Sequence, residues 1–323
     1  MPGRPYRPSM DEIAEARTRL ATYLPRTPLL RLDTEQPGRS VFLKLETLSP
    51  IGSFKIRPAL NALLSRDPET LRNGVATVSS GNMAYGMAWA AQTLGVPMAA
   101  YMYADAPVTK IEGVRRLGGE VRFVSHETWW RYIVGIERPD HAELLINPVT
   151  DQAVLAGNAT IGCEIVEDLP EVDWILAPYG GGALATGVAS AVKALRPKAR
   201  VLAVEDENAA PVSAALAAGR IIEIETRPSF IKSIGGPSLV PGLWPLARLL
   251  IDGAVTVSLP EVTHAMRLLF AKAKVVAEGA GAAALAAAMH GEQLTGNIVC
   301  IVSGGNIDAR AYAQVLGGAI PDP

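Results

Sequence analysis

The sequence is poor in cysteine, in net charge and in long apolar runs, and each shortage excludes a class of protein. The 323 residues include two cysteines, Cys163 and Cys300, which lack CxxC or Cys/His spacing, so we expect neither a disulfide framework nor a zinc site. A net charge of -2 with scattered basic residues gives no electrostatic reason to expect nucleic acid as a partner. These features predict a protein of a reducing compartment, the cytoplasm.

No segment has the composition of a membrane span or a signal peptide. Residues 1–11 are polar and contain proline, and the alanine-rich run 280–289 is too short to cross a bilayer. Hydrophobic residues make up 49% of the chain, which is ample for buried cores at this length. We therefore expect a soluble enzyme-sized protein of one large or two ordinary domains, without a membrane partner.

The order of apolar runs and turn signals predicts an α/β fold. Strands that alternate with helices imply parallel sheets with right-handed crossovers, flanked by helices. Trp129-Trp130 and the segment to Pro148 give no clear element; they could pack the end of a domain or line an active-site mouth, and packing is favoured. The expected strands are 41–45, 74–79, 98–103, 120–124, 174–177, 201–205 and 297–302, and capping-box patterns that predict helix starts lie at Ser9, Thr109 and Ser258.

Lys55 is the first candidate for chemistry, because it begins an expected helix directly after an expected strand. Its neighbours Phe54 and Ile56 would partly remove it from water and lower its pKa, as Schiff-base chemistry with an aldehyde requires. Most lysines in such places are solvated or lay their stems along apolar surface. The pentapeptide alone therefore favours a structural lysine, and other motifs are needed to decide.

Two loops of small residues between a strand and a helix are candidate anion sites. Free N–H groups and the helix dipole attract anions at such places, although the Ser-Ser-Gly-Asn loop at 79–82 is equally well explained as a capped turn. The three glycines at 180–182 let backbone N–H groups converge on a phosphate. Because the loop has neither a GK[ST] ending nor GxGxxG spacing, a monophosphate fits better than ATP or NAD.

The chain contains four motifs in this order: Gly-Ser-Phe-Lys-Ile-Arg at 52–57, Ser-Ser-Gly-Asn at 79–82, the glycines at 180–182 and Ser-Gly-Gly-Asn at 303–306. Together they resemble those of the fold-type-II pyridoxal-phosphate enzymes, and within them of threonine/serine dehydratases and serine racemase. The resemblance extends from about Thr27 to Asp308. It implies an α/β fold of the two-domain, tryptophan-synthase-beta-like type, with residues 1–44 and 148–323 as a large cofactor-binding domain and 45–147 as a small mobile domain.

The resemblance also implies roles for single residues. Lys55 would carry the cofactor as a Schiff base and remove the Cα proton, and Ser80 lies where serine racemase keeps its second base. A neutral Ser303 facing the pyridine nitrogen cannot stabilise a protonated ring, which suits β-elimination. The implied cofactor site is Phe54, Lys55, Asn82, Gly180, Gly181, Gly182, Ala183, Leu184, Glu278, Ser303 and Asn306, and the implied substrate site is Ser79, Ser80, Gly81, Asn82 and Met83.

The implied activity is a pyridoxal 5'-phosphate-dependent ammonia-lyase that eliminates water from a β-hydroxy amino acid and gives a 2-oxo acid and ammonia. Racemisation of serine or another amino acid and β-replacement stay open as alternatives, since the Ser80 motif is shared with dehydratases. A non-catalytic protein that only retains the cofactor is a further alternative, against which Lys55 and Ser303 argue. Family members are commonly dimers, so a homodimer is expected.

Two departures from the family pattern bear on substrate and metal. Met83 stands where the family usually has histidine, so the substrate can differ from plain threonine. Glu205 and Ala209 match two positions of the divalent-cation site of serine racemase, but Pro211 stands where a carboxylate ligand would be and cannot coordinate. We expect no metal here, with Glu205 and Ala209 as a weak candidate site.

Overall fold

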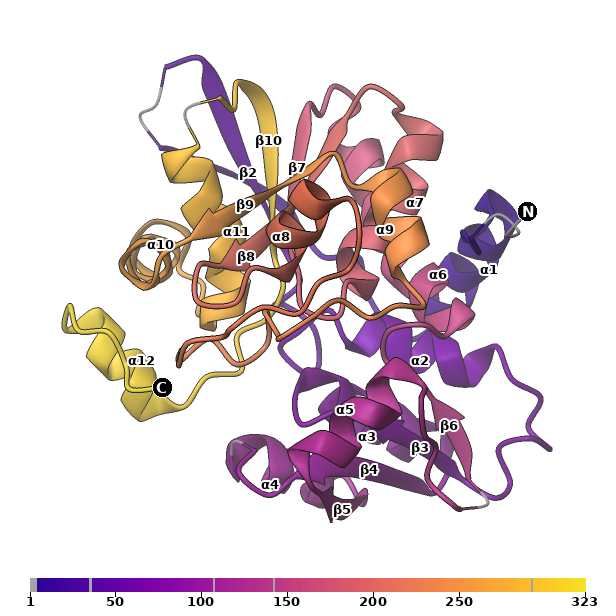
Figure 1. Cartoon of the computed structure of the whole chain (residues 1–323). Coiled ribbons are helices and arrows are strands. Elements are labelled where there is room, and N and C mark those ends of the chain that lie inside the picture. Colours follow the sequence, from indigo (N-terminus) through magenta and orange to yellow (C-terminus); the bar gives the residue numbers. More distant parts are fainter. Residues whose placement is uncertain (1–4, 35–36, 107, 142, 292) are drawn as a thin grey trace.

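Two sheets flanked by helices make up the computed structural model, which describes residues 5–34, 37–106, 108–141, 143–291 and 293–323 (Figure 1). The strands are β1 Leu29–Leu32, β2 Arg39–Leu45, β3 Val75–Val78, β4 Met98–Tyr103, β5 Glu120–Val124, β6 Leu144–Ile146, β7 Trp174–Pro178, β8 Arg200–Asp206, β9 Gly253–Val257 and β10 Gly296–Val302. The helices are α1 Met10–Ala21, α2 Ile56–Leu64, α3 Asn82–Leu94, α4 Val108–Arg116, α5 His126–Val134, α6 Gln152–Asp168, α7 Ala183–Leu195, α8 Pro211–Ala218, α9 Trp244–Leu250, α10 Leu259–Leu268 with a π-helical turn at Leu269–Ala273, α11 Gly279–His290 and α12 Ala309–Leu316.

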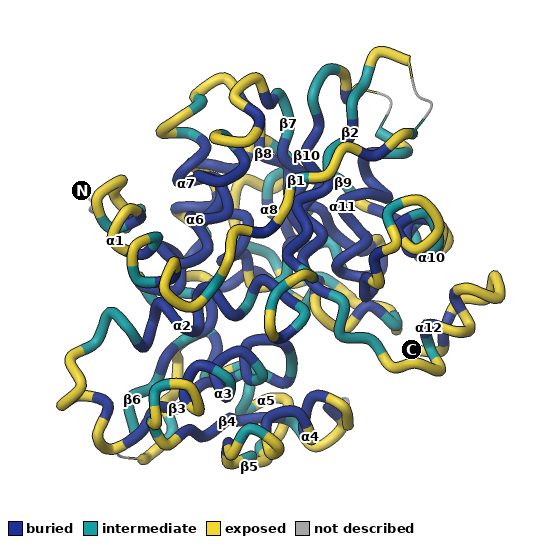
Figure 2. Tube along the Cα trace, turned by 180° about the vertical axis from the view of Figure 1, so that it is seen from behind, coloured by how far each residue is buried: buried dark blue, intermediate teal, exposed yellow. Residues whose placement is uncertain are grey.

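The larger sheet has the strand order β1-β2-β10-β7-β8-β9 and the smaller one β5-β4-β3-β6. Every pairing is parallel except that of β1 with β2. In Figure 1 the smaller sheet lies below the larger one, and α5 lies between the smaller sheet and the upper part of the molecule. Figure 2 shows the inner strands β3, β4, β7, β8 and β10 as largely buried, whereas the edge strands β1 and β5 carry exposed residues, as do the outer helices and loops. The predicted α/β class is therefore confirmed.

All seven predicted strands are present, but β1, β6 and β9 were not among them, and one predicted helix start is wrong. The capping box expected at Thr109 is wrong, since α4 already begins at Val108 and Thr109 lies within its first turn. The segment around Trp129 gave no predicted element, but Ser125 caps α5 by accepting a hydrogen bond from the Thr128 N–H. By contrast, the boxes at Ser9 and Ser258 are both formed. Within the described residues no helix is both long and apolar enough to span a bilayer.

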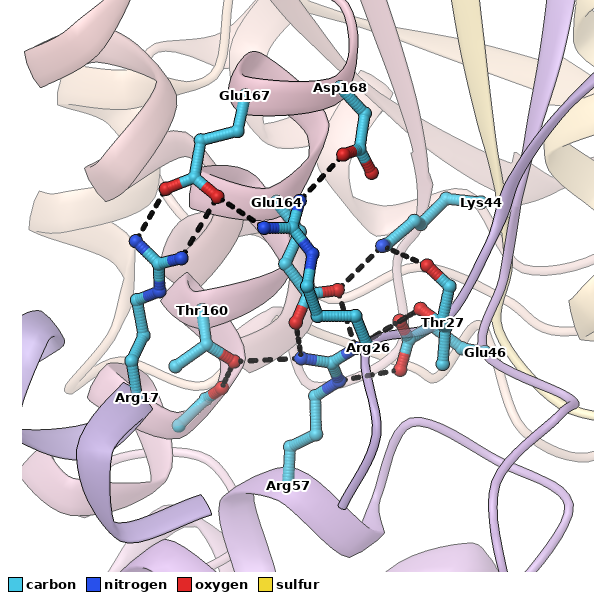
Figure 3. A network of polar contacts seen from close by, with 11 residues as sticks. Arg17, Arg26, Thr27, Lys44, Glu46, Arg57, Thr160, Glu164, Glu167 and Asp168 are labelled. Atoms are coloured by element: carbon cyan, nitrogen blue, oxygen red, sulfur yellow. Dashed lines mark hydrogen bonds and ion pairs between the residues drawn. The ribbon is translucent and has the colours of Figure 1, made fainter. Parts of the chain in front are cut away.

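A buried ionic network ties the start of α2 to β2 and α6 (Figure 3). The Arg57 guanidinium donates to both oxygens of Glu46, at 2.8 and 3.0 Å, and to both oxygens of Glu164, at 2.7 and 2.8 Å. Lys44 Nζ donates to Glu164 at 2.6 Å. Two cations and two anions, each no more than 8% exposed, balance one another. Because Arg57 follows Lys55 by two residues, the network fixes the backbone that carries the candidate lysine.

Candidate active site

Lys55 lies at the N-cap of α2, held against the end of β10. The Phe54 N–H donates to the Ser303 carbonyl at 2.9 Å, and Ser53 forms an isolated bridge with Gly304. Lys55 Nζ lies 4.8 Å from the centre of the Phe54 ring and makes no hydrogen bond or ion pair to another described residue. Burial lowers the pKa of this amine to about 8. About a tenth of Lys55 is therefore neutral, and nucleophilic, at pH 7, far more than of a lysine with the ordinary pKa.

The predicted loops meet Lys55 in one cavity of about 340 Å³. The Ser-Ser-Gly-Asn loop follows β3, the glycine loop follows β7 and Ser303 follows β10, so all three lie at carboxyl ends of parallel strands. Ligands of α/β sheets bind at such ends. The cavity is lined by every residue of the predicted cofactor and substrate sites except Asn306.

The glycine loop has the geometry of a phosphate cradle at the N-terminus of α7. Gly182 has φ 95°, and a Cβ at Gly182 would run into the Tyr179 hydroxyl, so the loop requires glycine there. A Cβ at Gly181 would come 2.5 Å from Val149 Cγ2. The N–H groups from Gly180 to Leu184 have no backbone acceptor among the described residues. Unpaired amides and the dipole of α7 together suit a phosphate group.

We predict that Gly182→Ala weakens the affinity for pyridoxal phosphate by about tenfold or more, because a non-glycine residue in this backbone region costs about 1–3 kcal/mol and displaces the amides. Ala183→Gly is the matched control, since it alters the same loop but keeps its N–H groups. The measurement is equilibrium binding of the cofactor to cofactor-free protein, followed by absorbance. Equal affinity of Gly182→Ala and the unaltered protein would remove the loop from the cofactor site.

Asn82 is oriented by partners on both sides. Its Nδ2 donates to Glu278 Oε1 at 2.7 Å, and its Oδ1 accepts from Asn306 Nδ2 at 2.9 Å. Asn306 Nδ2 also donates to the Ile51 carbonyl at 2.8 Å. The structure thus places Asn306 behind Asn82, where it positions that amide, whereas Asn82 and Glu278 border the cavity.

The residues predicted for the substrate lie at the N-terminus of α3. Ser79 Oγ accepts a hydrogen bond from the Gly81 N–H at 3.2 Å, and Ser80 Oγ accepts one from the Tyr103 N–H at 3.0 Å. Met83 is 1% exposed and closes the cavity from the first turn of the helix. Helix dipole and loop amides make this end of α3 the natural place for a carboxylate.

The structure also places beside Glu278 a residue that the sequence did not single out for the site. Lys110 on α4 is 6% exposed, and its Nζ lies 3.4 Å from Glu278 Oε2 and 3.5 Å from Ser233 Oγ. Lys110 thus supplies the counter-charge of Glu278 across the two sheets, and its only sequence signal was a capping pattern. Trp129 and Trp130, for which packing was the favoured prediction, line the cavity as well as packing on the core.

Glu205, one of the two residues of the weak candidate metal site, has a structural role in the fold. Glu205 accepts from the Val212 N–H at 2.6 Å and from the N–H and hydroxyl of Ser213, so its carboxylate caps α8. Burial, partly offset by these hydrogen bonds, raises the pKa of Glu205. Within the described part of the chain, no three His, Cys, Asp or Glu side chains gather as a metal site would require.

The sequence and the fold of the chain are both similar to those of known proteins. A sequence profile for the family described as pyridoxal-phosphate dependent enzyme matches residues 20–304. The chain belongs to this family. Its cofactor is therefore pyridoxal 5'-phosphate, and the unpaired Lys55 amine and the open phosphate cradle fit that group.

The proteins that are similar to this chain have names that indicate different activities. The L-threonine ammonia-lyase of Thermotoga maritima is 36% identical over 313 residues, which are 95% of this chain and 78% of the relative. The structure of maize serine racemase is 33% identical with a TM-score of 0.88, covering 97% of this chain and 98% of that one. The structure of a threonine deaminase from T.th. is 37% identical with a TM-score of 0.85, covering 93% and 99%. These likenesses confirm the predicted family and fold.

Proposed function

We propose that the protein is an ammonia-lyase that converts a β-hydroxy amino acid to a 2-oxo acid and ammonia. The observation that carries the proposal is the unpaired, low-pKa Lys55 in one cavity with two helix N-termini, one for a phosphate and one for a carboxylate. The similarity to proteins named threonine ammonia-lyase and threonine deaminase supports the same reaction.

Each part of the reaction can be assigned to residues of this chain. Pyridoxal phosphate supplies an electron-withdrawing ring that makes the Cα–H bond of an amino acid acidic. The amides from Gly180 to Leu184 hold the phosphate, and the loop at 79–82 binds the substrate carboxylate. Lys55 Nζ then takes the Cα proton, and the β C–O bond breaks with loss of water, which is taken up again when the product hydrolyses. The net reaction turns one hydroxy amino acid into one 2-oxo acid and one ammonia.

The pH dependence follows from the lowered pKa of Lys55. A base works only when it is unprotonated, so kcat should rise with pH and level off above a pH of about 8. Between pH 6 and 7 we expect a change of about tenfold per pH unit, the slope of one proton. Steady-state rates from pH 6 to 9.5 measure this, and a kcat that falls between pH 7 and 9 would show that Lys55 is not the base.

The activity itself is tested with purified, cofactor-loaded protein and a panel of L- and D-serine, L-threonine and bulkier β-hydroxy amino acids. The proposal expects a 2-oxo acid and ammonia in equal amounts from at least one panel member. Cofactor absorbance without 2-oxo acid from any member would overturn the lyase, and point to β-replacement or to a non-catalytic cofactor protein.

Racemisation is the second candidate, because Ser80 lines the cavity together with Lys55 and a similar structure is a serine racemase. A racemase needs a proton donor on the face of the substrate opposite its base, and the Ser80 hydroxyl is available as that donor. Chiral analysis of unreacted substrate separates the two activities. Formation of the D-enantiomer faster than 2-oxo acid would favour the racemase.

We also propose that residues 45–147 act as a small domain that closes over the cavity. All four strands of the smaller sheet lie in this range, and from it Asn82 and Lys110 contact Glu278 of the other part. X-ray scattering with and without a substrate analogue measures the closure.

We further propose that the protein is a homodimer and that it acts in the cytoplasm. Light scattering of the purified protein measures the assembly.

A further inference from the structure

Aromatic residues are scarce in this chain, yet several of them gather at the cavity. Phe, Trp and Tyr make up 6% of the sequence, with only five tryptophans. Two of those five, the adjacent Trp129 and Trp130, line the cavity from α5, and Tyr103 lines it from the end of β4. All three are only half-buried. We call Tyr103, Trp129 and Trp130 the aromatic wall.

The aromatic wall begins at the substrate loop. The Tyr103 N–H donates to Ser80 Oγ, so the first ring of the wall starts beside the serine that borders the predicted carboxylate site. The Trp129 ring packs edge-on against Tyr103, with centres 5.5 Å apart. The His126 ring stacks on Tyr103, with ring centres 4.1 Å apart. These contacts hold the Tyr103 ring in place, and a pre-formed aromatic surface loses little entropy when it binds an apolar group.

The same side of the cavity is apolar beyond the wall. Ile133, one turn after Trp129 on α5, is 4% exposed and lines the cavity, as does Val149 beside the glycine loop. Met83, 1% exposed, adds an apolar side chain next to the carboxylate site. Two lysines line the cavity, Lys55, which the proposed function assigns to the cofactor, and the exposed Lys232. Apolar side chains therefore lie beside both the carboxylate site and the phosphate cradle.

We infer that the substrate is a β-hydroxy amino acid whose β-carbon carries a bulky apolar group, most simply an aromatic ring, which lies against the aromatic wall. The inference rests on the proposed function for the reaction, but the preference for an apolar side chain follows from the cavity alone. Serine and threonine carry only hydrogen or a methyl group at this position. They would leave the apolar lining of this part of the cavity largely uncovered, and an aromatic ring would cover it.

The first test measures binding without turnover. L-Phenylalanine and L-alanine have no β-hydroxyl group, so neither can lose water, and calorimetry with the cofactor-loaded protein gives their dissociation constants. We expect L-phenylalanine to bind about tenfold or more tightly than L-alanine. Trp130→Ala should reduce this preference to about threefold or less. Equal affinity of the two amino acids for the unaltered protein would overturn the inference.

Trp174→Ala is the matched control, because it removes a tryptophan from the start of β7, at the opposite end of that strand from the glycine loop. It should leave the preference unchanged. An equal loss of preference in Trp174→Ala and Trp130→Ala would mean that a general disturbance of the fold, rather than the wall, is responsible. In that case the wall would have no specific role and the inference would fail.

The second test uses turnover and separates the inference from the proposed function. The kcat/KM for a β-phenyl-β-hydroxy amino acid should exceed that for L-threonine by about tenfold or more, and Trp130→Ala should lower it chiefly through KM. Faster turnover of L-threonine would overturn the inference and leave the lyase intact. No 2-oxo acid from any hydroxy amino acid, with a retained preference for L-phenylalanine, would overturn the lyase and leave the aromatic wall as a binding surface.

Discussion

Lys55→Ala should lower the rate of 2-oxo acid formation by about 10³-fold or more, because it removes the amine that lies among the predicted cofactor loops and acts as the base. The loss of a positioned general base alone costs about 10²–10⁴-fold, and Lys55 is also the residue expected to bond the cofactor. Steady-state assays of 2-oxo acid, together with the visible absorbance of the loaded protein, measure the effect.

Lys232→Ala is the control for this substitution. Lys232 also lines the cavity, but it is exposed, and we expect its loss to change the rate only a few-fold. If Lys232→Ala abolished the reaction and Lys55→Ala did not, the assignment of the reactive amine would be wrong. The phosphate cradle would still stand, since it does not depend on which lysine reacts.

Glu164→Gln should lower the free energy of unfolding by about 3–5 kcal/mol, the range found when a buried ion pair loses one partner. The carboxylate of Glu164 receives hydrogen bonds from Arg57 and Lys44, and its side chain is 8% exposed. Replacing it leaves a net positive charge in the interior. Because Arg57 is in the first turn after Lys55, we also expect weaker cofactor binding. Denaturant unfolding of the cofactor-free protein measures the loss.

Glu167→Gln is the matched control on the same helix. Glu167 pairs with Arg17 and Arg26 at the surface, as Figure 3 shows, and its side chain is 39% exposed. Solvent screens such pairs, so the expected cost is below about 1 kcal/mol. Equal losses for both variants would contradict the view that burial gives the network its strength.

The network also predicts an acid dependence. Burial acts to raise the pKa of Glu164, but hydrogen bonds and charges from Arg57 and Lys44 outweigh it, and the net pKa is lowered. A lowered carboxylate pKa contributes stability above the ordinary glutamate range, and this contribution is lost as the pH falls through the folded value. The difference in the free energy of unfolding between the unaltered protein and Glu164→Gln should therefore become smaller as the pH falls.

The sequence was sufficient for the parts of the site that depend on local backbone chemistry. The glycine loop needs residues without a Cβ in consecutive positions, and the lysine follows a strand and begins a helix, so both leave a mark within a few residues. Strands such as 98–103 were predicted with the observed bounds because a continuous apolar run ends at turn residues.

Contacts between distant segments could not be predicted in this way. Arg57 and Glu164 are 107 positions apart, and each alone is an ordinary charged residue that composition places on the surface. Lys110 on α4 reaches Glu278 at the start of α11 only because the fold brings together segments that are 168 positions apart. For Trp129 and Trp130 the sequence favoured packing over a place at the cavity, since neither spacing nor neighbours reveal which face of α5 borders a cavity.

The most direct test of the account is to locate the bound cofactor. Purified protein loaded with pyridoxal phosphate is reduced with borohydride, digested, and mapped by mass spectrometry for the lysine that has gained the pyridoxyl group. The account predicts one modified peptide, containing Lys55, and no such modification in Lys55→Ala. Modification of a different lysine, or of none in a protein that turns over its substrate, would contradict it.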